Sequence, residues 1–183
     1  MTDDLIATSY DDERTRIYWK DKAYEADYKL LQKKLPGKEI GFASGTKDER
    51  LFLIVAGSDT EPGERYLFDR NTKKLTLQYR IREKLNRDYL APMTAVRFKS
   101  SDGLEIPAYL TLPKGVPAKN LPAIILPHGG PWARDSWGYN GFAQFLANRG
   151  YAVLEPNFRG STGYGKKLST PATNNGVIRC RTT

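Results

Sequence analysis

Residues 121–165 read LPAIILPHGGPWARDSWGYNGFAQFLANRGYAVLEPNFRGSTGYG and hold the clearest pattern in the chain. The apolar run Leu121–Leu126 suits a buried strand, and it leads into the glycine turn His128–Pro131. Apolar residues recur at helical spacing over Phe142–Asn148, and a glycine follows where a helix C-cap is expected. Tyr151–Leu154 predicts a second buried strand. This order predicts a βαβ unit, whose right-handed crossover places its loops along one edge of a parallel sheet, where such folds bind ligands.

The sequence before this unit is rich in short strand-like runs. Turn-forming residues separate the four runs between residues 38 and 80, which are Ile40–Ala43, Leu51–Ala56, Arg65–Asp69 and Leu75–Tyr79. Four strands in about forty residues match the size of one β-propeller blade. A single blade needs neighbouring blades to cover both of its faces. Ahead of these runs, Tyr24–Lys34 predicts a short helix that Pro36-Gly37 would end.

After residue 93 the pattern changes to a hairpin. Ala95–Phe98 and Ile106–Leu112 are alternating or apolar runs. Ser101-Asp102-Gly103 lies between them and is a good hairpin signal. Together with the two buried strands of the βαβ unit, the hairpin predicts four strands in this half of the chain.

Three segments carry a resemblance to a known family. They are SSDGLEIPAYLTLPKG (residues 100–115), PHGGPW (127–132) and FLANRGYAVLEPNFRGSTGYG (145–165). In these segments the chain resembles the prolyl oligopeptidase family of serine peptidases, and within it the acylaminoacyl-peptidase or dipeptidyl-peptidase-like branch. The resemblance covers about residues 90 to 167, where several motifs fall in family order at family spacing.

The resemblance implies an α/β fold class, with an incomplete α/β-hydrolase domain preceded by the last part of a β-propeller. On this expectation residues 1–90 are the C-terminal remnant of the propeller, with one blade at about 38–80. Residues 91–167 are the N-terminal part of the catalytic domain, whose sheet begins with the antiparallel hairpin. About four of the usual eight strands are present, so the sheet would be half covered and the chain poorly folded by itself.

None of the catalytic triad is present in this chain. An α/β-hydrolase carries its nucleophilic serine in a G-x-S-x-G elbow, and that pattern is absent from the sequence. In the nearest match, Arg159–Gly163, arginine replaces the first glycine, and Ser161 follows the fourth strand, one βα unit too early. We interpret Ser161 as part of a glycine-rich loop. His128 is the only histidine and precedes the nucleophile region, whereas the order in these hydrolases is Ser, Asp, His.

The resemblance gives the turn after the first buried strand another role. His128, Gly129, Gly130 and Pro131 match the family's oxyanion-hole loop, in which the second glycine, here Gly130, offers its backbone N–H to the oxyanion. Such a donor is worth about 3 kcal/mol of transition-state stabilisation in a complete site. The alternative is that Gly129 and Gly130 only allow a tight turn after the strand.

Other candidate residues give weaker signals. Asp135 and Trp137 belong to the family-like stretch and are expected to border the substrate cleft, although a surface loop packed by tryptophan explains them equally well. No metal site is predicted, since one histidine and one cysteine cannot build one. No cofactor is predicted either, because Gly160, Gly163 and Gly165 run in reverse of the dinucleotide fingerprint.

The net charge of +8 does not indicate a nucleic-acid partner, because of its distribution. Residues 1–90 hold 18 basic and 17 acidic side chains, and residues 91–183 hold 11 and 4 that are scattered. No run reaches the length of a membrane helix, and the acidic start MTDDLIATSYDDER lacks the features of a signal peptide. The sequence therefore leaves the compartment open, with a cytoplasmic location by default and a periplasmic one compatible for the parent.

The last residues do not continue the resemblance. Residues 168–183 are polar, have no periodicity and hold the only cysteine, Cys180. Read one nucleotide earlier, the same stretch can encode Ala-Gly at Pro171-Ala172, Trp-Gly across Asn175–Val177 and Gln-Asp-Asp at Arg181–Thr183. The family continues with a similar string, so we predict an out-of-frame tail that results from the loss of one base. The alternative is a natural disordered C-terminus.

These observations predict a fragment of a serine-type peptidase, whose parent hydrolyses peptide bonds in short peptides through an acyl-enzyme. The chain alone is expected to be inactive, and a peptide substrate is expected only for the full-length parent. One alternative is a fragment of a carboxylesterase of the same fold. Another is a non-catalytic binding or dominant-negative product that acts on a full-length paralogue. The partners considered for the chain are such a paralogue or chaperones, and association with chaperones alone would contradict the binding role. No nucleic acid, membrane or cofactor is expected as a partner.

Overall fold

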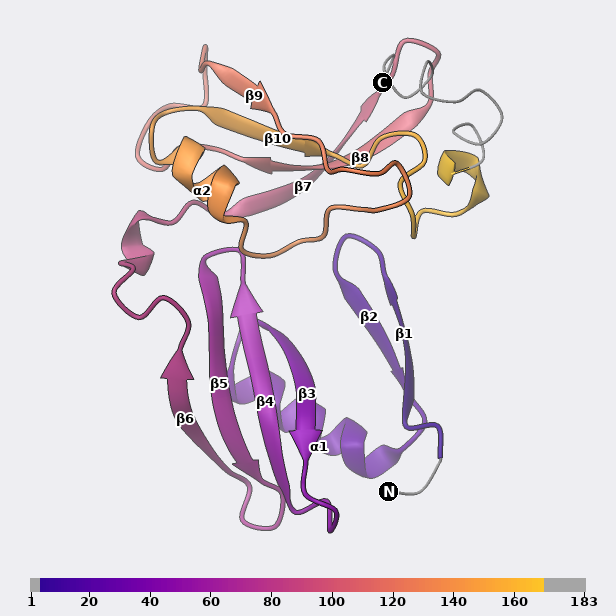
Figure 1. The fold of residues 1–183 in the computed structure, drawn as a ribbon, viewed down its shortest axis with the longest axis vertical. Coiled ribbons are helices and arrows are strands. Elements are labelled where there is room, and N and C mark those ends of the chain that lie inside the picture. The colour runs from indigo at the N-terminus through magenta and orange to yellow at the C-terminus, as the bar shows by residue number, and fades with distance from the viewer. Residues whose placement is uncertain (1–3, 170–183) are drawn as a thin grey trace. The chain divides into compact units, whose positions relative to one another are not determined.

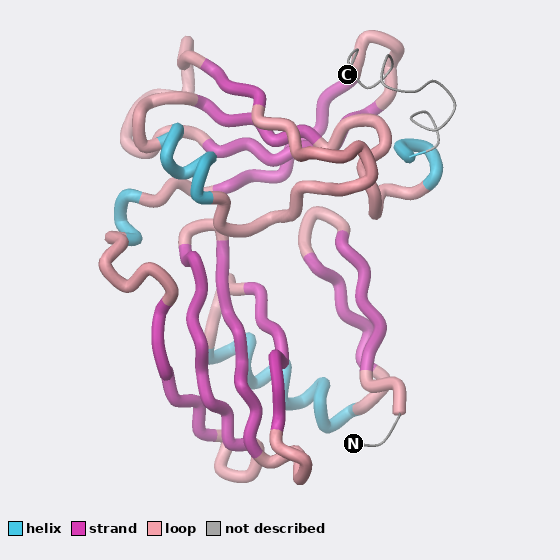
Figure 2. Tube along the Cα trace, viewed as in Figure 1, coloured by secondary structure: helices cyan, strands magenta, loops and turns pink. Residues whose placement is uncertain are grey.

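The structure, a computed structural model, describes residues 4–169. It divides into two compact units, which we describe separately: the first holds the residues up to Tyr10 and Thr15–Arg87, and the second holds Asp11–Arg14 and the residues from Asp88 onward. Strands predominate over helices in both units (Figures 1 and 2). None of the helices in the described part of the chain is long and apolar enough to span a lipid bilayer. Positions 170–183 of the predicted out-of-frame tail lie outside the described residues.

The first unit is built on a four-stranded antiparallel sheet whose strands follow chain order (Figure 1). They are β3 (Glu39–Gly45), β4 (Leu51–Ser58), β5 (Glu61–Asp69) and β6 (Lys74–Arg80). All four strands predicted between residues 38 and 80 are confirmed. β5 begins earlier than predicted, because the ladder with β4 continues past an irregularity to the pair Ser58 and Glu61.

A hairpin and a helix precede this sheet. β1 (Ala7–Asp11) and β2 (Thr15–Trp19) pair in a two-stranded sheet. The sequence pattern did not predict it, because polar residues interrupt the apolar alternation of both strands. α1 (Lys22–Lys34) confirms the predicted helix and begins two residues earlier than expected, directly after the capping residue Asp21.

Asp21 caps α1 through its carboxylate. Oδ1 accepts hydrogen bonds from the N–H groups of Ala23 (2.7 Å) and Tyr24 (3.0 Å). Asp21→Ala is therefore expected to destabilise the helix by about 1 kcal/mol, whereas Asp21→Asn keeps a capping oxygen and changes little. Hydrogen exchange of the α1 amides measures both effects. Equal exchange rates in the two variants would contradict the capping role.

The core of the first unit lies where α1 packs against the sheet. Alternate residues of β4 point into it, as the two-residue period of a strand requires. Phe52 makes an edge-to-face contact with Phe42 at 5.4 Å, and Ile54 and Phe68 are fully buried. From the helix, Leu31 is fully buried in the same cluster.

The second unit holds a four-stranded mixed sheet in the order β7-β8-β10-β9. The strands are β7 (Met93–Lys99), β8 (Glu105–Thr111), β9 (Ala123–Ile125) and β10 (Ala152–Pro156). β8 pairs antiparallel with β7 and with β10, and β10 pairs parallel with β9. The predicted hairpin and both predicted strands of the βαβ unit are therefore confirmed as strands of one sheet. The prediction that Leu121–Leu126 is a buried strand is wrong, because β9 is short and lies at the end of the sheet, where no further strand of the described residues covers it.

The helix α2 (Gly141–Ala147) connects β9 to β10 and packs against β10 (Figure 1). Gly150 follows it with φ +91°, the left-handed conformation expected after a helix. Because β9 and β10 are parallel, their carboxyl ends meet at one edge of the sheet. Burial differs between them: Val153 in β10 is fully buried, whereas Ile125 in the terminal strand β9 is 67% exposed.

Candidate functional site

Two loops leave the carboxyl ends of the parallel strands and contact each other. Loop 126–140 follows β9 and contains the predicted oxyanion residues, and loop 157–165 follows β10. Hydrogen bonds between them join residues that lie well apart in sequence, namely His128 with Ser161, Ala133 with Thr162, and Asp135 with Asn157. The site is therefore a pair of loops that support each other at the sheet edge.

His128 links the start of loop 126–140 to loop 157–165. Its Nε2 lies 2.8 Å from Ser161 Oγ, and its Nδ1 lies 2.8 Å from the carbonyl oxygen of Gly129. A carbonyl oxygen can only accept, so Nδ1 carries a proton, and in the neutral ring Nε2 accepts the Ser161 hydroxyl proton. The imidazole also stacks on the Phe158 ring, with centroids 4.5 Å apart.

A serine hydroxyl bonded to a histidine nitrogen resembles part of a catalytic triad, but Ser161 does not suit that role. Its side chain is fully buried, so a substrate carbonyl has no access to Oγ. The geometry agrees with the interpretation of Ser161 as a loop residue, and it adds the hydrogen bond to His128 that the sequence did not reveal.

Gly130 adopts a backbone conformation that L side chains rarely adopt. Its φ is +142°, and a Cβ atom built there would lie 2.8 Å from the backbone nitrogen of Trp132. At Gly129 a Cβ would meet nothing within 4 Å. The second glycine therefore determines the shape of the turn. Both glycines are exposed, and among the described residues none accepts a hydrogen bond from the Gly130 N–H.

Asp135 is held to loop 157–165 through its main chain. The side chain of Asn157 accepts a hydrogen bond from the Asp135 N–H (2.8 Å) and donates one to the Asp135 carbonyl oxygen (3.1 Å). Asn157 is fully buried, and its amide also donates to the Tyr164 hydroxyl at 3.0 Å. Burial raises the pKa of the Asp135 carboxyl, against the lowering influence of His128 and Arg134.

The two tryptophans of loop 126–140 differ in exposure. Trp137, predicted to border the cleft, donates its indole N–H to the Met93 carbonyl oxygen at 3.1 Å, and the guanidinium of Arg14 lies 3.5 Å from its ring centre. Trp132, which the sequence analysis did not single out, is 66% exposed and directly follows the HGGP turn. Contact of Asp135 and Trp137 with a substrate stays a prediction.

Arg134 fastens the same loop to the segment Asp11–Arg14 of the second unit. Its guanidinium donates to the carbonyl oxygens of Asp11 (3.0 Å) and Asp12 (2.8 Å) and to the Tyr164 hydroxyl (2.8 Å). From β8, the Tyr109 hydroxyl donates to the Glu13 carbonyl oxygen at 2.9 Å. The contacts with the segment Asp11–Arg14 could not be predicted from the sequence, because they join residues more than ninety positions apart.

Glu155 is a buried carboxyl at the end of β10. It is 2% exposed, and its Oε1 accepts a hydrogen bond from the side-chain amide of Asn140, the cap of α2. The pKa of Glu155 is raised to about 7, chiefly by burial, with the bond from Asn140 lowering it and the charge of Asp135 raising it. Within residues 4–169, neither Oε2 of Glu155 nor Oδ2 of Asp135 has a hydrogen-bond partner.

Glu155 is expected to make stability depend on pH. An unfolded glutamate ionises near its ordinary pKa of 4.5, whereas the folded group keeps its proton until about pH 7. Its contribution to stability is therefore fully present below the unfolded pKa and is lost as the pH rises through the folded one. Glu155→Gln removes that loss, so at about pH 8 the variant should melt above the wild type, while at about pH 5 the gap closes or reverses. Melting temperatures that differ equally at both pH values would contradict this.

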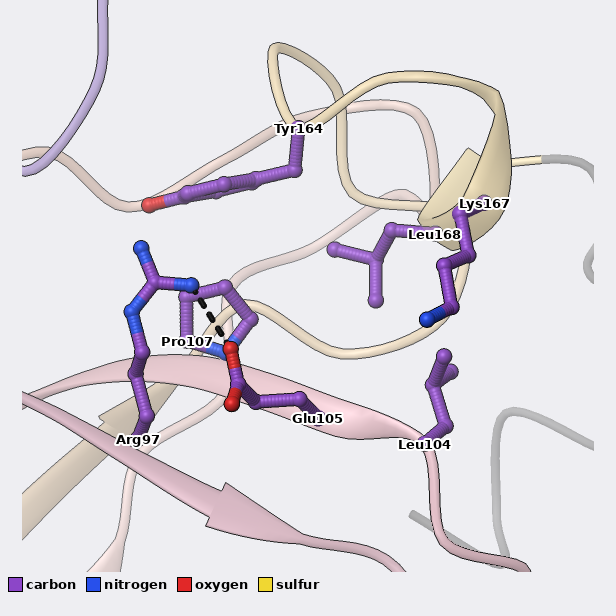
Figure 3. Close-up of a pocket in the computed structure, with 7 residues that line it drawn as sticks. All are labelled: Arg97, Leu104, Glu105, Pro107, Tyr164, Lys167 and Leu168. Carbon is purple, nitrogen blue, oxygen red and sulfur yellow. Dashed lines mark hydrogen bonds and ion pairs between the residues drawn. The ribbon is translucent and has the colours of Figure 1, made fainter.

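A small cavity of about 150 Å³ lies beside this network in the second unit. Figure 3 shows Arg97 and Tyr164 on one side of it and Lys167 and Leu168 on the other. The guanidinium of Arg97 is already paired with Glu105 at 2.9 Å and with Glu13 at 3.6 Å. The positive charge of Arg97 is thus neutralised within the fold.

No protein-family model matches the chain. Among curated proteins it is similar to dipeptidyl aminopeptidase BIII of Pseudoxanthomonas mexicana, with 41% identity over 163 residues that cover 84% of this chain and 24% of that protein. It is 40% identical over 72 residues to the acylamino-acid-releasing enzyme of Sus scrofa, covering 38% of this chain and 10% of that one. Among solved structures, puromycin hydrolase matches with a TM-score of 0.61 and 27% identity, over 80% of this chain and 24% of the other.

The chain belongs to the prolyl oligopeptidase family. This confirms the resemblance that the three sequence segments carried. The chain spans about a quarter of the length of dipeptidyl aminopeptidase BIII and of puromycin hydrolase, at 24% of each. The four residues predicted to form the oxyanion-hole loop lie in one turn at the edge of the sheet, shortly after β9. They are His128, Gly129, Gly130 and Pro131.

Proposed function

We propose that this chain is part of a longer serine peptidase, in which Gly130 supplies a backbone N–H to the oxyanion hole. The observation that carries the proposal is the conformation of Gly130: the turn needs glycine there, and the exposed N–H has no acceptor among the described residues. A developing oxyanion is stabilised by a backbone N–H that has no hydrogen-bond partner inside the protein. The carboxyl end of a parallel strand is where such folds bind their ligands.

The strand order supports a hydrolase domain as the frame of this site. The sheet β7-β8-β10-β9 begins with an antiparallel hairpin and passes into a parallel pair joined by a helix. On this proposal it is the first half of an α/β-hydrolase sheet, and further strands pair with β9, whose Ile125 is exposed. The four-stranded meander of the first unit has the strand order of a propeller blade, and we propose it as the last part of a β-propeller.

The remainder of the longer protein would provide the nucleophilic serine, the acid and the histidine base. The serine oxygen attacks the substrate carbonyl carbon, the histidine takes the serine proton, and the carbonyl oxygen becomes an oxyanion that accepts a hydrogen bond from the Gly130 N–H. The C–N bond then breaks, the leaving amine takes the proton from the histidine, and an acyl-enzyme remains for water to hydrolyse. His128 serves the loop and is not this base, because the serine bonded to its Nε2 is Ser161, which is fully buried and out of reach of a substrate carbonyl.

The relatives suggest which peptides the longer protein cleaves. The relative from Pseudoxanthomonas mexicana is named a dipeptidyl aminopeptidase, and its 41% identity extends over 84% of this chain. The relative named an acylamino-acid-releasing enzyme matches only 38% of the chain. We therefore propose that the longer protein releases dipeptides from free N-termini, and we favour this activity over the release of acylated residues.

Three fluorogenic substrates test this proposal on the full-length protein in the restored reading frame: a dipeptidyl amide, an acetylated amino-acid amide and a short ester. We expect the dipeptidyl amide to be cleaved with the highest kcat/KM, and a fluorophosphonate to label one serine. Cleavage of the ester alone would indicate a carboxylesterase. A folded full-length protein that cleaves none of the three and takes up no label would overturn the proposal.

The sequence of residues 168–183 also supports the proposal that the chain is part of a longer peptidase. We propose that residues 168–183 are encoded one base out of frame, because the neighbouring frame can encode Trp-Gly across Asn175–Val177 and Gln-Asp-Asp at Arg181–Thr183. The elbow serine, the acid and the histidine would then follow in the restored frame, in the order found in these hydrolases.

A further inference from the structure

The tip of loop 126–140 is exposed, although the oxyanion role proposed above needs it to be fixed. Gly129, Gly130 and Trp132 are all exposed. A donor in an oxyanion hole acts only when it lies about 2.7–3.1 Å from the position of the oxyanion. A misplacement of about 1 Å can cost about 100-fold in rate. Something outside the turn must therefore hold Gly130 in place.

Loop 157–165 holds this turn on the side of His128. The Ser161 hydroxyl donates to His128 Nε2 at 2.8 Å, and the Phe158 ring stacks on the imidazole at 4.5 Å. Ser161 is fully buried, so water does not compete for the bond. His128 lies two residues before Gly130, and its position fixes where the turn begins.

The same loop holds the turn on the other side. The side chain of Asn157 accepts a hydrogen bond from the Asp135 N–H at 2.8 Å and donates one to the Asp135 carbonyl oxygen at 3.1 Å. The Thr162 N–H donates to the Ala133 carbonyl oxygen at 2.9 Å. Asn157 is itself anchored, because its backbone N–H donates to the Pro107 carbonyl oxygen in β8 at 2.8 Å. The segment between His128 and Asp135 is thus hydrogen-bonded at each end to a buried side chain, Ser161 at one end and Asn157 at the other.

We propose that Ser161 and Asn157 are positioning residues for the proposed peptidase reaction, which hold loop 126–140 from both sides and aim the Gly130 N–H at the oxyanion. This inference rests on the proposed function. Neither side chain touches the reacting atoms; each acts through the loop. Ser161 sets the position of His128 before the glycine turn, and Asn157 sets the position of Asp135 after it.

The test compares Ser161→Ala, Asn157→Ala and the double variant in the full-length protein, with Thr162→Ala as the matched control. Thr162 is the exposed neighbour of Ser161, and its contact with Ala133 is made by its backbone, which the substitution keeps. Active sites are titrated with a fluorophosphonate, so that kcat refers only to folded enzyme. The oxyanion bond forms in the transition state, so a displaced donor lowers kcat and leaves KM almost unchanged.

We expect each single variant to lower kcat about 10-fold and the double variant about 100-fold, with KM altered less than about threefold. Hydrogen exchange should rise in the peptide that covers residues 126–135, and Thr162→Ala should match the wild type in both measurements. An unchanged kcat per titrated site in the double variant would overturn the inference. So would a fall in kcat without faster exchange in that peptide. An inactive wild type with ordered loops would instead count against the proposed function, and the exchange data alone would then decide whether these residues hold the loop.

Discussion

Gly130→Ala in the full-length protein is expected to lower kcat by about 100-fold or more, the loss seen when one oxyanion donor is removed. The added methyl group meets the Trp132 backbone nitrogen at 2.8 Å, and an alanine is strained at φ +142°. The obstacle is backbone, which cannot rotate away as a flexible side chain can. The turn must change shape, and the Gly130 N–H moves with it.

Gly129→Ala is the matched control for this experiment. The two residues are neighbours in the same turn, and a Cβ at Gly129 would meet nothing within 4 Å. Steady-state kinetics on a dipeptidyl amide, corrected by active-site titration, should show a nearly unchanged kcat for Gly129→Ala. Equal losses in the two variants would mean that the turn as a whole, and not the second glycine, sets the rate.

Asp27→Ala is expected to produce a large loss of stability in the first unit. Asp27 is 1% exposed, and its carboxylate lies 2.5 Å from Arg70 Nε and 2.6 Å from Lys73 Nζ. Removing one partner of a buried ion pair costs about 3–5 kcal/mol, because the other charge stays buried without it. Arg70 keeps a contact of 3.3 Å with Glu49, which points to the lower end of that range.

Glu25→Ala on the same helix is the control for Asp27→Ala. It removes the exposed pair between Glu25 and Lys29, which is worth less than about 0.5 kcal/mol. Hydrogen exchange of the α1 and β5 amides gives the opening free energy of this unit directly. A loss below about 1 kcal/mol for Asp27→Ala would contradict a stabilising role for the buried pair.

The elements that the sequence predicted are those with a local pattern. Leu121–Leu126 and Tyr151–Leu154 are apolar runs, and the helix between them repeats at 3.6 residues, so β9, α2 and β10 could all be placed. The four strands of the first unit followed in the same way from alternation and turn residues. The hairpin β1–β2 was missed because its strands, ATSYD and TRIYW, are largely polar.

The candidate site was only partly predictable for a different reason. The HGGP turn can be recognised in the sequence, but the residues that hold this turn in place cannot. Ser161 and His128 are separated by 33 positions, and Asn157 and Asp135 by 22, in loops without periodicity. Glu155 did carry a readable signal, since a charged residue interrupts the apolar run AVLEP, and such a residue is buried only with a hydrogen-bond partner.

Sequencing the gene from codon Gly160 onward tests most directly the claim that this chain is part of a serine peptidase. We predict that the triplet across Asn175 and Gly176 is TGG. We also predict that the neighbouring frame reads Gln-Asp-Asp over the last three codons and then runs on to a G-x-S-x-G elbow, an aspartate and a histidine, in that order. Any other triplet at that junction, or no elbow in any of the three frames, would contradict the account.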